Sequence, residues 1–130
     1  MKHVLLVEPD RVLADTYRRA FIADGYSVTM CASAQSAIFA ADEKRPDVVV
    51  AELQLIRHSG IEFLYEFRSY DDWHDVPVVI NSQVPPSEFS RSWQLLNREL
   101  GVEQYYYKPS TTLATLLSAI RRLTNPLPAS

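Results

Sequence analysis

Short apolar runs without polar alternation recur along the chain, and they predict buried strands. Strands that are covered on both faces have this composition, and such strands usually belong to parallel sheets. The runs place five strands at Lys2–Val7, Tyr26–Cys31, Asp47–Glu52, Val76–Asn81 and Gln104–Tyr107.

Between these runs, apolar residues recur at intervals of three and four, which is typical of helices with one buried face. The segments are Leu13–Phe21, Ala34–Ala41, Ile61–Arg68, Ser87–Leu100 and Leu113–Ile120. The fourth segment has the weakest pattern, because polar residues interrupt it and two prolines precede it. Strands and helices that alternate from end to end predict an α/β fold with a doubly wound parallel sheet.

Residues that favour helix ends support this assignment. Candidate N-caps precede three of the helices: Asp10, Ser33, and Ser110 or Thr111. Gly25 and Gly101 follow the first and fourth helices, where a left-handed residue commonly ends a helix.

The bulk composition is that of one domain. The chain has 130 residues, of which 47% are apolar, enough for a buried core. We expect a domain over residues 1–123 and a proline-containing tail or linker start over residues 124–130. The net charge of -3 gives no basic field for nucleic acid. A single cysteine and the lack of a long N-terminal apolar run favour a cytoplasmic location and no membrane contact.

Four polar residues stand at or near the ends of predicted strands. They are Glu8, Glu52, Ser82 and Lys108. In open α/β sheets, ligands bind beyond the carboxyl ends of the strands. The spacing therefore predicts one polar site along one edge of the sheet.

Five motifs in this order resemble the receiver domain of two-component response regulators over essentially the whole chain. They are "HVLLVEPD", "RPDVVVAEL", "HSGIEF", "VPVVINSQ" and "GVEQYYYKPS". The resemblance implies a flavodoxin-like (βα)5 architecture with strand order 2-1-3-4-5 and a role in phosphorelay signalling. It implies a signalling protein and no enzyme.

In that family, two adjacent acids help to hold Mg²⁺, an Asp accepts a phosphoryl group, and a Ser or Thr and a Lys grip its oxygens. The resemblance assigns the first acid to Glu8, the hydroxyl to Ser82 and the lysine to Lys108. It also makes Tyr105 the aromatic residue whose rotamer reports the switch.

Two positions depart from the family pattern. Pro9 stands in place of the second acid, and Glu52 stands in place of the phosphoacceptor. Mg²⁺ depends on well-placed carboxylates, so we expect no metal site, or a weak one at Glu8, Asp10 and Glu52, and no other cofactor. Glu52 carries its carboxylate one methylene further out, and phosphoryl transfer is sensitive to such displacements.

The longer arm of Glu52 has a second consequence. It can reach toward Lys108 and Ser82 and place negative charge near the position of a phosphoryl oxygen. Such a contact can bias a switch whose two states differ by a few kcal/mol. Two interpretations stay open here: Glu52 imitates the activated state, or the switch is lost.

The sequence therefore favours an atypical receiver domain that acts through phosphorylation-independent protein contacts. The resemblance places the partner or homodimer surface on the fourth helix, fifth strand and fifth helix. The polar residues available there are Arg91, Arg98, Gln104, Tyr105, Arg121 and Arg122.

Three other functions are compatible with the sequence. Glu52 could still accept a phosphoryl group, with Asp10 helping to hold Mg²⁺. The chain could be the regulatory domain of a longer response regulator whose output domain lies beyond residue 130. An unrelated flavodoxin-like enzyme would need a bound cofactor, although no glycine-rich phosphate loop follows any strand.

Overall fold

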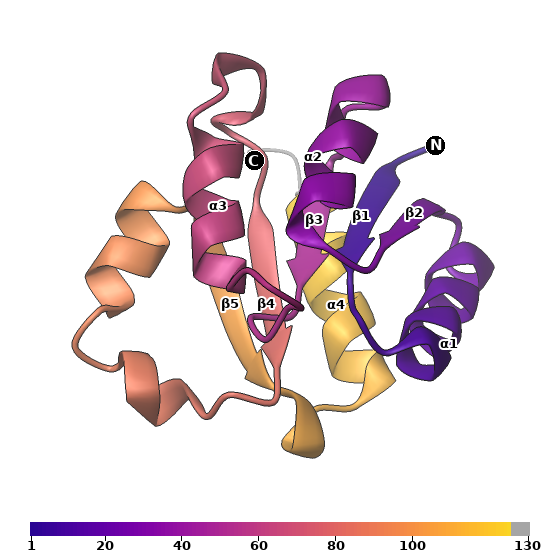
Figure 1. The fold of residues 1–130 in the computed structure, drawn as a ribbon. Coiled ribbons are helices and arrows are strands. Elements are labelled where there is room, and N and C mark those ends of the chain that lie inside the picture. Colours follow the sequence, from indigo (N-terminus) through magenta and orange to yellow (C-terminus); the bar gives the residue numbers. More distant parts are fainter. Residues whose placement is uncertain (126–130) are drawn as a thin grey trace, which may run out of the picture.

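The computed structural model describes residues 1–125, which form one five-stranded parallel sheet (Figure 1). The strand order is β2-β1-β3-β4-β5, and every neighbouring pair is parallel. This confirms the predicted doubly wound fold. The strands are β1 His3–Val7, β2 Ser27–Cys31, β3 Val48–Ala51, β4 Val78–Ser82 and β5 Val102–Tyr107.

Helices cover both faces of the sheet and divide its core in two. They are α1 Arg11–Ala23, α2 Ala34–Glu43, α3 Gly60–Arg68 and α4 Leu113–Thr124. One apolar cluster joins α2 and α3 to the sheet, and the other joins α1 and α4 to its opposite face. Successive side chains of a strand point to opposite faces, so Leu5 and Val7 enter the first cluster while Val4 and Leu6 enter the second.

The prediction of an α-helix over Ser87–Leu100 is wrong. The chain instead forms a short 3-10 helix, η2 Pro86–Phe89, and a π-helical turn, η3 Leu95–Glu99. A helix is stabilised mainly by packing of an apolar face, and only Leu96 and Leu100 of this segment are fully buried. The last helix is therefore α4, and the predicted partner surface has two short turns where an α-helix was expected.

The helix caps agree with the sequence at two positions and differ at a third. The side chains of Asp10 and Ser33 accept backbone N–H groups at the starts of α1 and α2. The cap of α4 is Thr112, not Ser110 or Thr111. The reason is the 3-10 turn η4 over Lys108–Ser110, which delays the start of the helix.

The two predicted glycine stops have left-handed backbone conformations. Gly25 has φ of 97° and Gly101 has φ of 69°, which a residue without a Cβ adopts at little cost. Helix α4 includes Thr124, so the tail does not begin at residue 124 as expected. Residues 126–130 of the predicted tail lie outside the described residues.

The guanidinium of Arg68 binds four backbone carbonyls near the amino ends of β4 and β5, a role that the sequence did not indicate. Burial lowers its pKa. Its nitrogens donate to the carbonyl oxygens of Trp73, Val76, Leu100 and Gly101. Buried carbonyls are costly to leave unpaired, so this one side chain fastens α3 to the amino ends of two strands.

Within residues 1–125, none of the helices has both the length and the apolar character needed to cross a bilayer.

Candidate functional site

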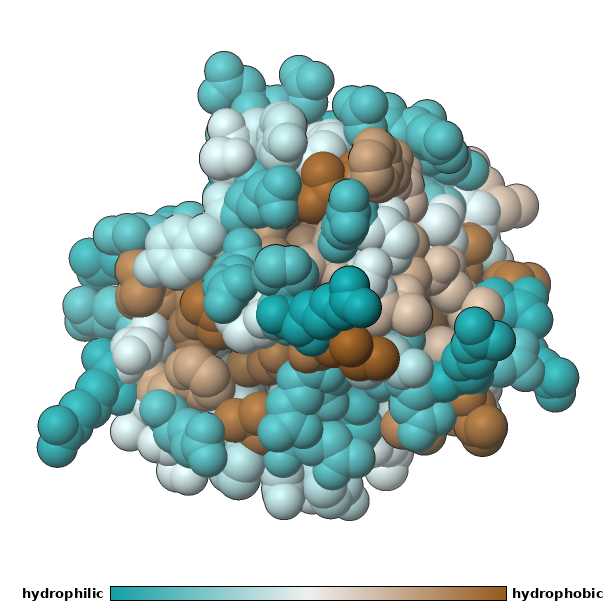
Figure 2. Space-filling model, in the orientation of Figure 1, coloured by the Kyte–Doolittle hydropathy of each residue, from teal (hydrophilic) through white to brown (hydrophobic). Residues whose placement is uncertain are grey.

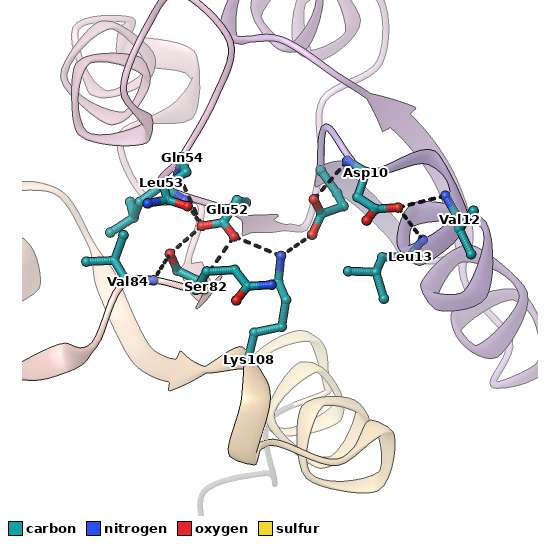
Figure 3. A network of polar contacts seen from close by, with 11 residues as sticks. Asp10, Val12, Leu13, Glu52, Leu53, Gln54, Ser82, Val84 and Lys108 are labelled. Carbon is teal, nitrogen blue, oxygen red and sulfur yellow. Dashed lines mark hydrogen bonds and ion pairs between the residues drawn. The ribbon is translucent and has the colours of Figure 1, made fainter.

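Side chains from four strand ends meet at the carboxyl edge of the sheet (Figure 3). The Lys108 ammonium lies between two carboxylates, 2.5 Å from Glu8 Oε1 and 2.8 Å from Glu52 Oε1. The Ser82 hydroxyl donates to Glu52 Oε2. The structure therefore brings together the four residues that strand-end spacing selected.

The Glu52 carboxylate is fully engaged in hydrogen bonds. Its Oε2 accepts from the backbone N–H groups of Leu53 at 2.6 Å and Gln54 at 3.2 Å, and from the Ser82 hydroxyl. Its Oε1 accepts from Gln83 N at 3.1 Å and from Lys108 Nζ. An ionised carboxylate offers about four lone-pair sites. Five donors leave this group no free acceptor capacity.

Close backbone packing fixes the loop that carries Glu52. Helix α3 begins at Gly60, whose N–H donates to Leu53 O at 2.7 Å. A Cβ at this position would lie 2.6 Å from Leu53 Cα and 2.7 Å from Glu52 O. Ser59 caps the same helix through Glu62 N. Position 60 must therefore be glycine for α3 to contact the backbone beside the site.

Burial is the largest single influence on the pKa of each group in this network, but the hydrogen bonds and ion pairs that oppose it outweigh it together. Burial alone would lower the pKa of Lys108, but hydrogen bonds and charge attraction from Glu52 and Glu8 raise it. Burial alone would raise the pKa of Glu52, but Lys108, Ser82 and backbone donors lower it. Both directions describe a charged pair at neutral pH. The side chains are 3% exposed for Glu52 and 7% for Lys108.

The donor set does not fit Mg²⁺. Pro9 offers no side-chain oxygen, and the Asp10 carboxylate turns toward α1, where Oδ1 accepts from Val12 N and Leu13 N (Figure 3). The two remaining carboxylates both bind Lys108. Among residues 1–125, no three His, Cys, Asp or Glu side chains are grouped as metal ligands would be. Mg²⁺ needs near-octahedral oxygen ligands, and here an ammonium lies between the candidate oxygens.

Tyr105 is linked to the same network through the loop after β4. Its hydroxyl donates to Val84 O at 2.6 Å, and Val84 N donates to Ser82 Oγ at 3.0 Å. Burial raises the pKa of Tyr105 to about 12. Its ring packs against Phe89 with centroids 5.8 Å apart. A hydrogen-bonded path thus runs from Glu52 to the aromatic residue at the molecular surface.

The residues predicted for the partner surface do not all lie free on it. Arg91, Arg98 and Arg122 are exposed, and Gln104 is half-buried. Arg121 forms a two-pronged pair with Asp24 at the end of α1, at 2.6 and 2.7 Å. Arg121 therefore links the end of α1 to α4 and already has an ion-pair partner within the domain.

Sequence reasoning missed two parts of the site. One is the bond from Lys108 to Glu8, because only the Glu52 contact was expected. The other is the set of backbone donors around Glu52. Main-chain groups carry no sequence signal, although the glycine at position 60 marks the close approach that places them.

A family model for the response regulator receiver domain matches residues 4–121. This chain belongs to that family. Receiver domains are parts of two-component signalling proteins, which agrees with the resemblance that the motifs carried.

Individual response regulators are similar to this chain at 28–29% sequence identity. The response regulator MprA of Mycolicibacterium vanbaalenii is 28% identical over 124 residues, covering 93% of this chain and 51% of the relative. The KDP operon transcriptional regulatory protein KdpE of Escherichia coli is 29% identical over 125 residues, covering 94% and 52%. The chain therefore spans about half the length of these curated relatives.

Solved structures share the fold. The chemotaxis protein CheY4 of Vibrio cholerae matches with a TM-score of 0.82 at 21% identity, covering 95% of this chain and 98% of that one. A receiver domain protein of Methanospirillum hungatei has the same TM-score at 18% identity, covering 96% and 94%.

Proposed function

We propose that this receiver domain works without phosphorylation, as a protein-binding module whose phosphoryl site is filled by its own side chains. The observation that carries the proposal is the Lys108 ammonium held between Glu8 and Glu52. This contact replaces a switchable site with a permanent internal ion pair.

The site offers few ligands for a metal ion. Phosphoryl transfer is catalysed largely by positioning and by neutralising charge, and metal ions supply much of that neutralisation. Here Pro9 offers no ligand and Asp10 caps α1. Lys108 already pairs with both carboxylates that remain. A divalent cation entering this site would have to displace that ammonium.

The Glu52 carboxylate is a poor phosphoryl acceptor. A carboxylate that attacks phosphorus needs a free lone pair and an approach to about 3–3.5 Å. Glu52 accepts five hydrogen bonds and is 3% exposed. It lacks both the free lone pair and the open approach. This argues against the alternative in which Glu52 becomes phosphorylated.

The hydrogen bonds of Glu52 hold the switch residues in one arrangement. Glu52 holds Ser82 and Lys108, the two groups that in the family grip a phosphoryl group, and it also binds Gln83 N. Through Val84 the same network reaches Tyr105. We therefore infer that Glu52 acts as a built-in substitute for the phosphoryl group and holds the domain in one state.

The partner surface that this state presents lies over η2, η3 and β5. It contains a hollow of about 330 Å³ lined by Pro86, Phe89, Ser90, Trp93, Gln104 and Tyr105. Two exposed arginines lie nearby in sequence, Arg91 between η2 and η3 and Arg98 within η3. Aromatic and arginine side chains are the residues that most often dominate binding energy at protein interfaces. These features support a protein partner here. The net charge of -3 is the reason that we propose no direct nucleic-acid binding.

A second candidate follows from the length of the relatives. Since the chain spans about half of each, it could regulate a further domain of a longer response regulator. The reading frame beyond Ser130 tests this candidate.

The direct test is chemical labelling. The protein is incubated with acetyl phosphate and Mg²⁺, and its intact mass is measured. We expect no phosphoryl adduct. The control is Pro9→Asp/Glu52→Asp, which restores the second family acid and the shorter acceptor side chain; it should gain an adduct. A phosphoryl group on Glu52 in the unaltered protein would refute the proposal.

A further inference from the structure

A groove between α2 and α3 has no assigned role. It has a volume of about 650 Å³. Its lining shares no residue with the Glu8–Glu52–Ser82–Lys108 network. Helix α2 contributes Ala34, Gln35, Ile38 and Phe39, and the α3 side contributes His58, Glu62, Phe63, Glu66 and Tyr70.

The apolar part of the groove is exposed to solvent. Phe39 is 66% exposed and Tyr70 is 44% exposed, above a floor made by buried Ala34 and Phe63. Figure 2 shows hydrophobic atoms on the α2 side of this face bordered by hydrophilic atoms over α3. An exposed apolar patch rimmed by polar groups is typical of an interaction site.

The charged part of the groove has a single sign. Glu62 and Glu66 lie one turn apart on α3, and the lining contains no Lys or Arg. Within residues 1–125, no Lys or Arg pairs with either glutamate, and the contact of Glu62 is with His58 Nδ1 at 3.3 Å. Residues four apart on a helix have Cβ atoms about 5–6 Å apart. This spacing matches two cationic side chains on successive turns of a partner helix.

We propose that the α2–α3 groove binds a cationic amphipathic helix of a partner protein. Its apolar stripe packs on Phe39, Ile38 and Tyr70, and its Lys or Arg side chains pair with Glu62 and Glu66. An amphipathic helix that lays its apolar face in a groove is a recurring recognition mode. Glu62 and Glu66 favour a partner helix of positive charge, because like charges across an interface are strongly disfavoured.

A second copy of this chain fits the groove less well. On α1, Arg18 and Arg19 already pair with Asp15, and on α4, Arg121 pairs with Asp24. Within residues 1–125 this leaves each of these helices one arginine without an ion pair, Arg11 and Arg122, instead of two cations on successive turns. A groove of one copy filled by a helix of another is also a head-to-tail contact, which builds open chains unless the rotation closes a ring. The partner is therefore a different protein.

The test uses two synthetic stapled helical peptides. Both carry a leucine stripe; one borders it with lysines on successive turns, and the other has glutamates in their place. Binding to the ¹⁵N-labelled protein is followed by amide shifts and by fluorescence titration. We expect the cationic peptide to shift amides of α2 and α3, and the acidic peptide to bind at least about tenfold more weakly.

Variants locate the contact. Glu62→Gln/Glu66→Gln should weaken binding of the cationic peptide about fivefold, and Phe39→Ala about tenfold. The matched control, Asp42→Asn/Glu43→Gln, removes the same charge from the exposed end of α2 outside the groove. It should leave affinity nearly unchanged. Thermal melting confirms that each variant stays folded.

Three results would overturn the proposal. They are equal affinity for both peptides, amide shifts centred outside α2 and α3, or equal losses in the two charge variants. Sedimentation analysis adds a fourth. Self-association that Phe39→Ala abolishes would assign the groove to a second copy.

Discussion

Replacing Lys108 with methionine removes the cation at the centre of the site while keeping an unbranched side chain of similar length. The two carboxylates that bind it, Glu8 and Glu52, are both nearly inaccessible to solvent. After the substitution, two negative charges share a buried position with no cation between them. We expect this variant to be strongly destabilised at neutral pH.

The magnitude follows from the contact distances. At 2.8 Å and an effective dielectric of about 20, one charge pair has a gross attraction of about 6 kcal/mol. Desolvation of the lysine and the carboxylates offsets much of this attraction in the intact protein. Removing one partner of a buried pair typically costs about 3–5 kcal/mol. We therefore expect Lys108→Met to lower the free energy of unfolding by that amount at pH 7.

The stability of the variant should change with pH in the opposite direction to that of the intact protein. In the intact protein the pKa of Glu52 lies below 4.5, so its stabilisation is present above that pH and is lost as pH falls through the folded-state pKa. In Lys108→Met, desolvation and repulsion from the Glu8 carboxylate raise the pKa of Glu52. Protonation then removes the repulsion between the carboxylates, and the free energy of unfolding of the variant should rise as pH falls from 7 toward 5.

Urea unfolding at several pH values measures both effects. Glu52→Gln/Lys108→Met is the companion variant, because it removes one of the two stranded charges and should recover much of the loss. A cost below about 1 kcal/mol, the range of exposed ion pairs, would contradict a buried network. So would a stability that falls in parallel with that of the intact protein between pH 7 and 5.

Three further predictions concern stability. Arg68→Met should cost about 3 kcal/mol in urea unfolding, because buried carbonyls lose their donors, and a loss near zero would show that water replaces the guanidinium. Gly60→Ala places a Cβ 2.6 Å from Leu53 Cα and should cost about 1–3 kcal/mol; an unchanged melting temperature would mean that α3 moves freely. His3 is buried with its pKa lowered from 6.5 by burial and by Lys44, so stability should decline as pH falls below about 6.5. His3→Gln should flatten that decline, and an identical pH profile in the variant would assign the decline to another group.

The sequence was sufficient to predict the strands of the sheet and the residues that meet at its carboxyl edge. All five strands were located to within two residues. Uninterrupted apolar runs marked β1, β3 and β4, because strands buried along their whole length leave little choice of residue type, whereas the edge strands β2 and β5 are partly exposed and include polar residues. Glu52, Ser82 and Lys108 follow from strand ends alone, since parallel strands bring their carboxyl ends to the same edge.

The parts that could not be predicted depend on tertiary contacts. The segment Ser87–Leu100 has weak helical periodicity, and whether it becomes one helix or two turns depends on how Leu96 and Leu100 pack beneath it. The role of Arg68 depends on carbonyls that come from segments distant in sequence. The saturation of Glu52 depends on main-chain donors, which every residue except proline possesses.

The central claim is that the receiver site is filled by its own side chains, and an NMR titration tests it most directly. Mg²⁺ and beryllofluoride are added to ¹⁵N,¹³C-labelled protein while the side-chain and amide signals of Glu52, Gln83 and Lys108 are followed. The account predicts no saturable change at these residues. Saturable shifts at Glu52 and Lys108, with Lys108 released from Glu8, would contradict it.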